Sequence, residues 1–241
     1  MSIDIKLLVA ITVIALTISS VFYYTSHREI TDANALSLRA IDASKDTKSY
    51  RFTISTNLSM PAQGEVIDML SGEGCVDYRN KKMRSTITTM DRSVEVVVIG
   101  DTAYTRESNG LWQMQELGGY YGSMWERDYD VLAQQRSILL NATNATMYKE
   151  DDSWVLDIIP DNEEVLEQMR KTGTGLETIR EEELKDFSIR YWIEKDSYHI
   201  MRVENRVELE MNIGGMVTPM QLGSSVYFDS YNEKMEVEAP I

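Results

Sequence analysis

Hydrophobic and polar residues alternate most clearly over residues 50–60. Side chains on successive residues of a strand point to opposite faces, so a period of two predicts a long strand with one apolar and one polar face. Asn57 falls on the polar face. The positions on the other face are Tyr50, Phe52, Ile54, Thr56, Leu58 and Met60.

Shorter segments with strand character follow along the chain. Gly72 and Gly74 indicate a bend or bulge in the second of them. Residues 94–99 are apolar at nearly every position, which predicts that both faces of that strand are covered. Asn109-Gly110 is typical of a hairpin turn. The expected strands after residues 50–60 are 66–78, 83–90, 94–99, 102–107, 111–115, 145–149, 154–159, 187–193, 201–211 and 226–231.

Three segments instead have helical spacing: residues 31–45, residues 125–140, and a third helix that begins with Asp161 as its N-cap. Long strands joined by short turns indicate an antiparallel meander and not βαβ units. We therefore expect an α+β fold that is mainly antiparallel β. Its large curved sheet, of about eleven strands, would form an unclosed half-barrel with a few helices packed on the concave side.

The first thirty residues contain a long uncharged apolar stretch. Residues 7–24 read LLVAITVIALTISSVFYY, without a charged residue, Pro or Gly. As a helix they would span about 27 Å, close to the hydrocarbon thickness of a bilayer. We expect residues 1–26 to be a transmembrane signal-anchor, and a cleaved signal peptide is the alternative. Residues 27–241 would then form a single extracytoplasmic domain.

Acceptor sequons for N-glycosylation favour an extracytoplasmic location. They begin at Asn57, Asn141 and Asn144, and the last two follow one another in a polar stretch after an expected helix. We therefore expect a single-pass protein of the cell membrane that contacts the bilayer through residues 7–24. The bulk of the chain would lie on the extracytoplasmic side, and these three asparagines are candidate glycosylation sites.

Composition and charge disfavour several classes of function. The chain has 241 residues, with 24 Lys and Arg against 39 Asp and Glu, for a net charge of −15. Such a balance disfavours a nucleic-acid partner, which requires a clustered basic surface. Cys75 is the one cysteine and there are two histidines, which excludes an internal disulfide and a multi-cysteine metal site. The acidic residues 150–152 fall in an expected turn, so carboxylate catalysis is disfavoured. We expect no enzymatic activity, cofactor or metal.

Several segments together carry a resemblance to a known family. The opening helix runs into Lys48-Ser-Tyr-Arg-Phe52 and its long strand. Gly74-Cys-Val-Asp-Tyr78 leads to Asn80-Lys-Lys-Met83, then to Ala103-Tyr104 and to Trp112 around a hairpin. Residues 226–232, followed by Val237 and Pro240, form a similar closing strand.

Over most of residues 31–241 the chain resembles the LolA/LolB-like superfamily, which includes the mycobacterial lipid-binding lipoproteins of the LppX and LprG type. The resemblance implies a half-open antiparallel barrel, plugged by helices, that holds acyl chains or a lipoprotein's lipid in an apolar cleft. The chain departs from the lipoprotein members because no acylated cysteine follows its signal. It would therefore be an N-terminally anchored variant.

The apolar strand faces provide the candidate ligand contacts. Several are methionines, whose flexible side chains can line a cavity for variable apolar ligands or can simply fill a core. We expect a lipid or another hydrophobic ligand in a half-barrel cleft. The alternative is a non-enzymatic interaction or sensor module with a filled core, an acidic outer surface and an unknown protein partner. The expected cleft residues are Tyr50, Phe52, Ile54, Leu58, Met60, Met83, Tyr104, Trp112, Met114, Tyr191, Met201, Val203, Val207 and Leu209.

Overall fold

The computed structural model describes residues 32–62, 64–117, 130–142, 144–160, 180–213 and 215–240. Within these ranges the chain forms eleven strands, two α-helices and a short 3₁₀ helix at Glu181–Glu183. The helices are α2 (Ala33–Asp46) and α4 (Val131–Leu140). The strands are β1 (Ser49–Met60), β2 (Glu65–Asp77), β3 (Lys82–Thr89), β4 (Ser93–Ile99), β5 (Thr102–Glu107), β6 (Gln113–Glu116), β7 (Ala145–Glu150), β8 (Ser153–Ile158), β9 (Leu184–Glu194), β10 (Ile200–Ile213) and β11 (Met216–Asp229).

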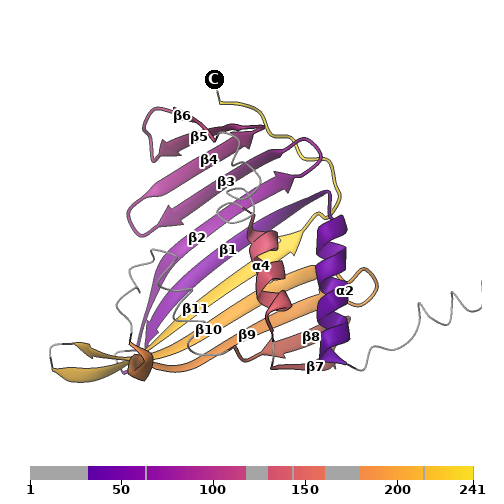
Figure 1. Ribbon diagram of the computed structural model, residues 1–241. Coiled ribbons are helices and arrows are strands. Elements are labelled where there is room, and N and C mark those ends of the chain that lie inside the picture. Colours follow the sequence, from indigo (N-terminus) through magenta and orange to yellow (C-terminus); the bar gives the residue numbers. More distant parts are fainter. Residues whose placement is uncertain are drawn as a thin grey trace, which may run out of the picture.

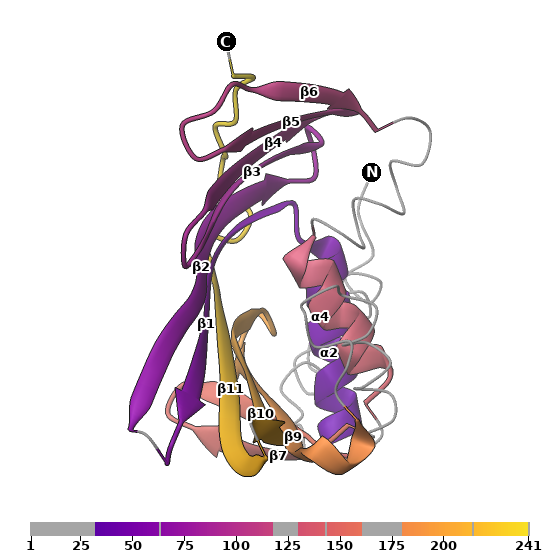
Figure 2. The same ribbon diagram turned by 90° about the vertical axis from the view of Figure 1, so that its left-hand side faces the viewer.

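All eleven strands belong to one antiparallel sheet, in the order β6-β5-β4-β3-β2-β1-β11-β10-β9-β8-β7 (Figure 1). The first strand pairs with the last, so β1 and β11 lie in the middle of the sheet. The edge strands β6 and β7 do not pair with each other, and the sheet curves towards the two helices (Figure 2). The predicted fold, an unclosed half-barrel with helices on its concave side, is confirmed.

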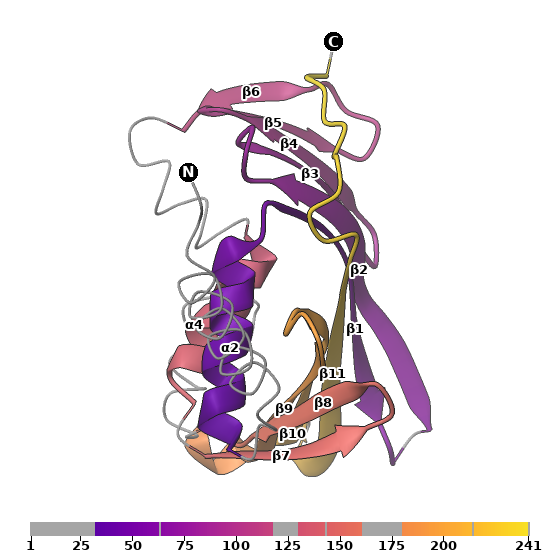
Figure 3. The same cartoon turned by 90° about the vertical axis from the view of Figure 1, so that its right-hand side faces the viewer.

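The two helices lie side by side against the concave face of the sheet (Figures 2 and 3). Asp32 caps α2 by accepting a hydrogen bond from the backbone N–H of Asn34 at 3.2 Å, as short polar side chains do at helix starts. α4 begins after its own cap, Asp130. The expected helix over 125–140 is therefore described from residue 131, whereas its first residues and the expected helix after Asp161 lie outside the described residues.

β11 is much longer than the strand expected over 226–231, because it starts at Met216. Pro219 and Gly223 weaken the strand signal of this segment in the sequence, since both residue types are depleted in strand interiors. Pro219 is tolerated because pairing of β11 with β1 extends only to Gln221, whereas Pro219 pairs with Glu210 of β10 on the other side. Residues 216–225 thus make up ten of the fourteen residues of this central strand.

The C-terminal segment after β11 lies along the outer side of the sheet (Figure 3). Met235 and Val237 are buried there, and the Lys82 Nζ donates a hydrogen bond of 3.0 Å to the carbonyl oxygen of Val237. In β4, Val97 and Val98 point to opposite faces and both are buried. The expectation that both faces of this strand are covered is therefore confirmed only toward its C-terminal end.

Candidate functional site

The pairing register aligns the side chains of the concave face in rows that cross the central strands. One row joins Ile54 of β1, Val226 of β11, Val203 of β10 and Tyr191 of β9. A second row, four residues further along β1, joins Leu58, Leu222, Val207 and Phe187. Because directly opposite residues in an antiparallel sheet share a face, these rows define a continuous inner surface made by strands far apart in the sequence.

The part of this surface next to the helices is densely packed. Tyr50, Tyr191 and Val203 have no exposed surface, and Phe228 has 1%. They belong to one hydrophobic cluster that also includes Leu132 and Leu139 of α4. The helices therefore fill the half-barrel here, as a core does.

Hydrogen bonds fix α4 in this position. The buried Asp130 accepts hydrogen bonds from the hydroxyls of Tyr50 (3.0 Å) and Tyr78 (2.7 Å) and from the backbone N–H of Ala133 (2.9 Å). Burial, with a further contribution from the Asp130 carboxyl, raises the pKa of Tyr50 and of Tyr78 well above the ordinary value. Both phenols therefore remain protonated and serve as donors to the carboxyl group.

A second polar contact joins the middle of α4 to the sheet. The Tyr191 hydroxyl donates to the Oε1 of Gln135 at 3.1 Å, and both side chains are buried. Burial raises the pKa of Tyr191 as well. The helix is thus attached at its N-terminus and near its centre, and both attachments use tyrosines of the inner face.

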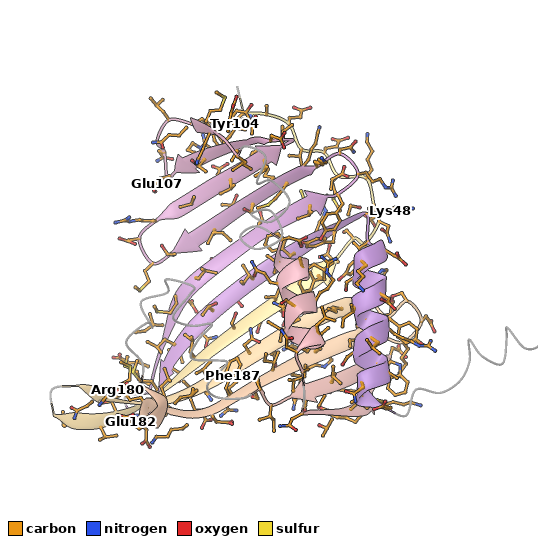
Figure 4. All side chains as sticks on the ribbon, in the orientation of Figure 1. Lys48, Tyr104, Glu107, Arg180, Glu182 and Phe187 are labelled. Atoms are coloured by element: carbon orange, nitrogen blue, oxygen red, sulfur yellow. The ribbon has the colours of Figure 1, made fainter. Side chains whose placement is uncertain are left out.

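Beyond the helices the inner surface stays apolar but is less completely covered. Leu58, Met60, Phe187 and Leu222 are all half-buried. Phe187 lies on β9 outside the part of the sheet that α4 covers (Figure 4). A second hydrophobic cluster forms in this region, with buried Leu184, Val207 and Leu209 and with partly buried Phe187, Met211, Met220 and Leu222. Phe187 also packs against the first cluster.

Two glycines of β2 leave space on the inner face for side chains of the neighbouring strands. A Cβ at Gly74 would lie 2.6 Å from the ring of Phe52, and one at Gly72 would lie 2.4 Å from the Cδ1 of Ile87 and 3.3 Å from the Cγ2 of Ile54. Side chains from the neighbouring strands therefore extend over β2 at these positions. The sequence signal for an irregular strand reflects this close packing, although β2 also has a register shift opposite Thr56 and Asn57.

Ten of the fourteen expected cleft residues lie on the inner face, and four do not. Tyr104 and Met114 pair with each other on the outer face, because the neighbouring Ala103 is the residue of β5 that points into the core. Met114 is 69% exposed. Tyr104 lies at the opposite end of the sheet from Phe187 (Figure 4). The inner residues are Tyr50, Phe52, Ile54, Leu58, Met60, Met83, Tyr191, Val203, Val207 and Leu209.

Trp112 and Met201 are the other two corrections. Trp112 precedes β6 and lies beside Arg106, whose guanidinium carbon is 4.7 Å from the indole centroid. Met201 is displaced from the inner face by a β-bulge between Ile200 and Arg202. Since a shift of one residue moves a side chain to the other face, Ile200 is fully buried whereas Met201 is 36% exposed.

The outer face of the sheet is polar and its charges are largely paired. Arg202 lies between two aromatic rings, 4.4 Å from the centroid of Trp192 and 5.1 Å from that of Tyr227. Arg190 forms an ion pair of 2.6 Å with Asp157. An open pocket of about 580 Å³ also lies on this side, lined mainly by polar and charged residues that include Cys75. Its polar lining is unsuited to an apolar ligand, so the inner face is the better candidate site.

His199 directly precedes β10. It is half-buried and stacks on the ring of Tyr231, with 4.1 Å between centroids and 4° between planes. Burial lowers the pKa of His199, and the nearby Glu194 carboxylate opposes this in part. The imidazole is therefore held in its neutral form more strongly than a free histidine.

Asn57, Asn141 and Asn144 are all exposed. Asn141 is also the C-cap of α4, and its Nδ2 donates to the carbonyl oxygen of Ser137 at 3.2 Å. Use of these three sequons for glycosylation stays a prediction. Among the residues that the structure describes, no cluster of three or more His, Cys, Asp or Glu side chains could hold a metal ion.

Comparisons with known proteins define the class of fold. The chain has the half-barrel fold of the LppX-type lipoproteins, as the sequence resemblance implied. The lipoprotein LppX of Mycobacterium tuberculosis superposes with a TM-score of 0.52 at 16% identity, over 86% of this chain and 98% of that one. LprF of Mycobacterium bovis gives 0.53 at 12% identity, over 86% and 96%. At these identities the similarity establishes the fold alone.

A LolA superfamily protein of Nitrosomonas europaea also matches over 86% of this chain, but with a TM-score of 0.31 at 10% identity. No protein-family model matches the sequence, and no curated protein matches it significantly. The expected membrane span over residues 7–24 lies outside the described residues. Among the described helices, none has both the length and the apolar character needed to cross a bilayer.

Proposed function

We propose that this chain is a non-enzymatic, membrane-anchored extracytoplasmic protein that binds a lipid or another apolar ligand on the inner face of its half-barrel. The main support is the apolar inner surface, which continues past the helices as half-buried Leu58, Leu222 and Phe187. A monomeric domain usually covers such a surface or uses it for binding. The fold shared with the LppX-type lipoproteins is consistent with this role.

The ligand can bind through apolar contacts alone. Burying roughly ten methylene groups at about 0.8 kcal/mol each gives a gross gain near 8 kcal/mol before ordering costs. Methionines such as Met60, Met211 and Met220 on this surface can repack around chains of different length. We therefore propose a site that accepts apolar chains of different lengths.

The anchored and extracytoplasmic parts of the proposal rest on the sequence. Residues 7–24 have the length and composition of a bilayer span, and the exposed Asn57, Asn141 and Asn144 are accessible as acceptor sites. In this arrangement the half-barrel would collect or present its ligand close to the membrane surface.

The orientation can be tested by adding protease to intact cells or spheroplasts. Digestion of residues 27–241 is expected, whereas full protection would overturn the orientation.

A second function is favoured by the packing beneath the helices. Tyr50, Tyr191 and Val203 are completely buried there, so the interior is already filled beneath the helices. If the remaining inner surface is also filled, the protein is an interaction or sensor module that uses its acidic outer surface. A ligand-binding experiment with a blocking substitution separates the two functions.

The substitution Ile54→Trp is suited to this experiment because Ile54 is half-buried and points to the inner face. Thr53→Trp places the same ring on the exposed outer face of β1 and is the matched control. The purified full chain is titrated with an environment-sensitive acyl probe, and its unfolding temperature is measured in parallel. A ligand-binding protein would lose binding in Ile54→Trp and retain it in Thr53→Trp.

In an interaction module, wild-type protein would bind no acyl probe. Ile54→Trp would then overpack the interior and lower the free energy of unfolding by roughly 1–3 kcal/mol. Val203 is a poorer position for the test, since it is fully buried and a larger side chain there would destabilise the fold under either function.

A further inference from the structure

A row of polar side chains crosses the apolar inner face. Thr56 of β1 lies opposite Ser224 of β11, and Ser224 lies opposite Asn205 of β10. The hydroxyl of Thr56 donates to the Ser224 Oγ at 3.2 Å. All three side chains are half-buried. Polar groups on an inner sheet face lose hydration, so they need partners from the protein or from a ligand.

The row lies between the two hydrophobic parts of the inner face. On one side is the row of Ile54, Val226 and Val203, which belongs to the cluster packed against the helices. On the other side is the row of Leu222 and Val207, which belongs to the second cluster. Successive rows on one face are about 7 Å apart along the strands. A long apolar ligand that follows the strands would therefore pass directly over the polar row.

The side-chain oxygen of Asn205 lacks a hydrogen-bond partner within the described part of the structure. Its Oδ1 is buried and accepts no hydrogen bond there. On the β9 side it lies opposite Ile189, which is buried and apolar and provides no donor through its side chain. An unpaired buried acceptor destabilises a fold, and replacing it by an apolar group of similar shape is often nearly neutral. The position is therefore unfavourable unless a bound molecule supplies the donor.

We infer that Asn205 and Ser224 bind a hydroxyl group carried by the acyl chain of the ligand. The ligand O–H donates to the Asn205 Oδ1, and the Ser224 hydroxyl, which already accepts from Thr56, can donate its own hydrogen to the ligand oxygen. A plain methylene chain or an ester carbonyl has no hydrogen to donate, so neither would satisfy Asn205. This inference rests on the proposed function and narrows its ligand class to hydroxylated acyl chains.

The test compares probes that differ only in the hydroxyl group. The full chain is purified in a mild detergent and titrated with radiolabelled octadecanoic acid and with its 3-, 10- and 12-hydroxy derivatives. The same titrations are made with Asn205→Leu, which removes the acceptor and keeps an inward side chain of similar size. Because each comparison is a ratio between two proteins, partition of the probe into detergent cancels. Ser55→Leu, on the exposed outer face of β1, is the control.

The measured quantity is the ratio of the affinity for a hydroxylated probe to the affinity for octadecanoic acid. For at least one hydroxylated probe, this ratio should be about tenfold higher in wild-type protein than in Asn205→Leu. Ser55→Leu should behave as the wild type, and the unfolding temperature of Asn205→Leu should not fall. If octadecanoic acid binds but every hydroxylated probe shows the same ratio in both proteins within about twofold, this inference is overturned and the proposed function stands. If no probe binds wild-type protein, both are overturned.

Discussion

The attachment of α4 through Asp130 predicts a large loss of stability when that side chain is removed. In Asp130→Ala the helix loses its N-cap contact to the Ala133 N–H, which costs about 1 kcal/mol. The hydroxyls of Tyr50 and Tyr78 each lose a buried acceptor, at about 1–2 kcal/mol apiece. The substitution also removes the cost of burying the carboxyl group, and this offsets part of the lost stability. We expect a net loss of about 3 kcal/mol.

The loss can be measured by urea unfolding and by thermal unfolding followed by circular dichroism. For a chain of this size it corresponds to a fall in Tm of roughly 6–12 °C. Asp130→Asn keeps one acceptor oxygen and should lose less. Asp152→Ala, in an exposed turn, is the control and should change stability by less than about 0.5 kcal/mol.

A double-mutant cycle between Asp130→Ala and Tyr78→Phe tests the mechanism. Residues joined by a hydrogen bond should be non-additive by about 0.5–3 kcal/mol. If Asp130→Ala lowers the free energy of unfolding by less than about 1 kcal/mol, or if the two substitutions are additive, these hydrogen bonds do not hold α4 to the sheet.

Three further predictions concern single residues. Burial lowers the pKa of His199 in the folded state, so the unfolded state binds the proton more readily. The contribution of His199 to the free energy of unfolding should therefore be complete above the unfolded pKa and decrease as the pH drops below about 6.5. His199→Phe should flatten this decline in urea unfolding measured at pH 7.5 and pH 5; an unchanged slope would assign the decline to other groups. Ile200→Ala should lose about 2–4 kcal/mol and Met201→Ala under about 1, whereas equal losses would contradict the bulge. Burial raises the pKa of Cys75, so iodoacetamide should modify it more slowly at pH 8 in the folded than in the urea-unfolded protein; equal rates would contradict its burial.

The local sequence pattern predicted a strand and its inner face correctly wherever the alternation of apolar and polar residues was strong. The period of two over residues 50–60 predicted β1 with the correct inner face, because from Tyr50 to Leu58 its inner positions are buried or half-buried whereas the residues between them are exposed. The period over 187–193 did the same for β9. The fold class followed from the number of such strands and the short turns between them.

The pattern failed where a neighbouring strand changed the outcome. By a period of two, Met201 should lie on the same face as Val203. A β-bulge in the pairing of β10 with β9 turns it outwards instead. Tyr104 has a neighbour, Ala103, that is small enough to pack in the core, so hydrophobicity alone assigned the wrong residue to the inner face. Bulges and register depend on the partner strand, and this information is absent from the local sequence.

The sequence by itself determined that the chain would build a curved antiparallel sheet with one apolar face, because alternation over many strands is a local property with a local cause. Only the tertiary structure decided which residues share a row on that face. The alignment of Thr56, Ser224 and Asn205 joins positions up to 168 residues apart through hydrogen-bonded registers. The role of Asp130 likewise depends on Tyr50 of β1 and Tyr78, which directly follows β2, meeting one helix end. Such contacts are set by the packing of the whole domain, so no local pattern predicts them.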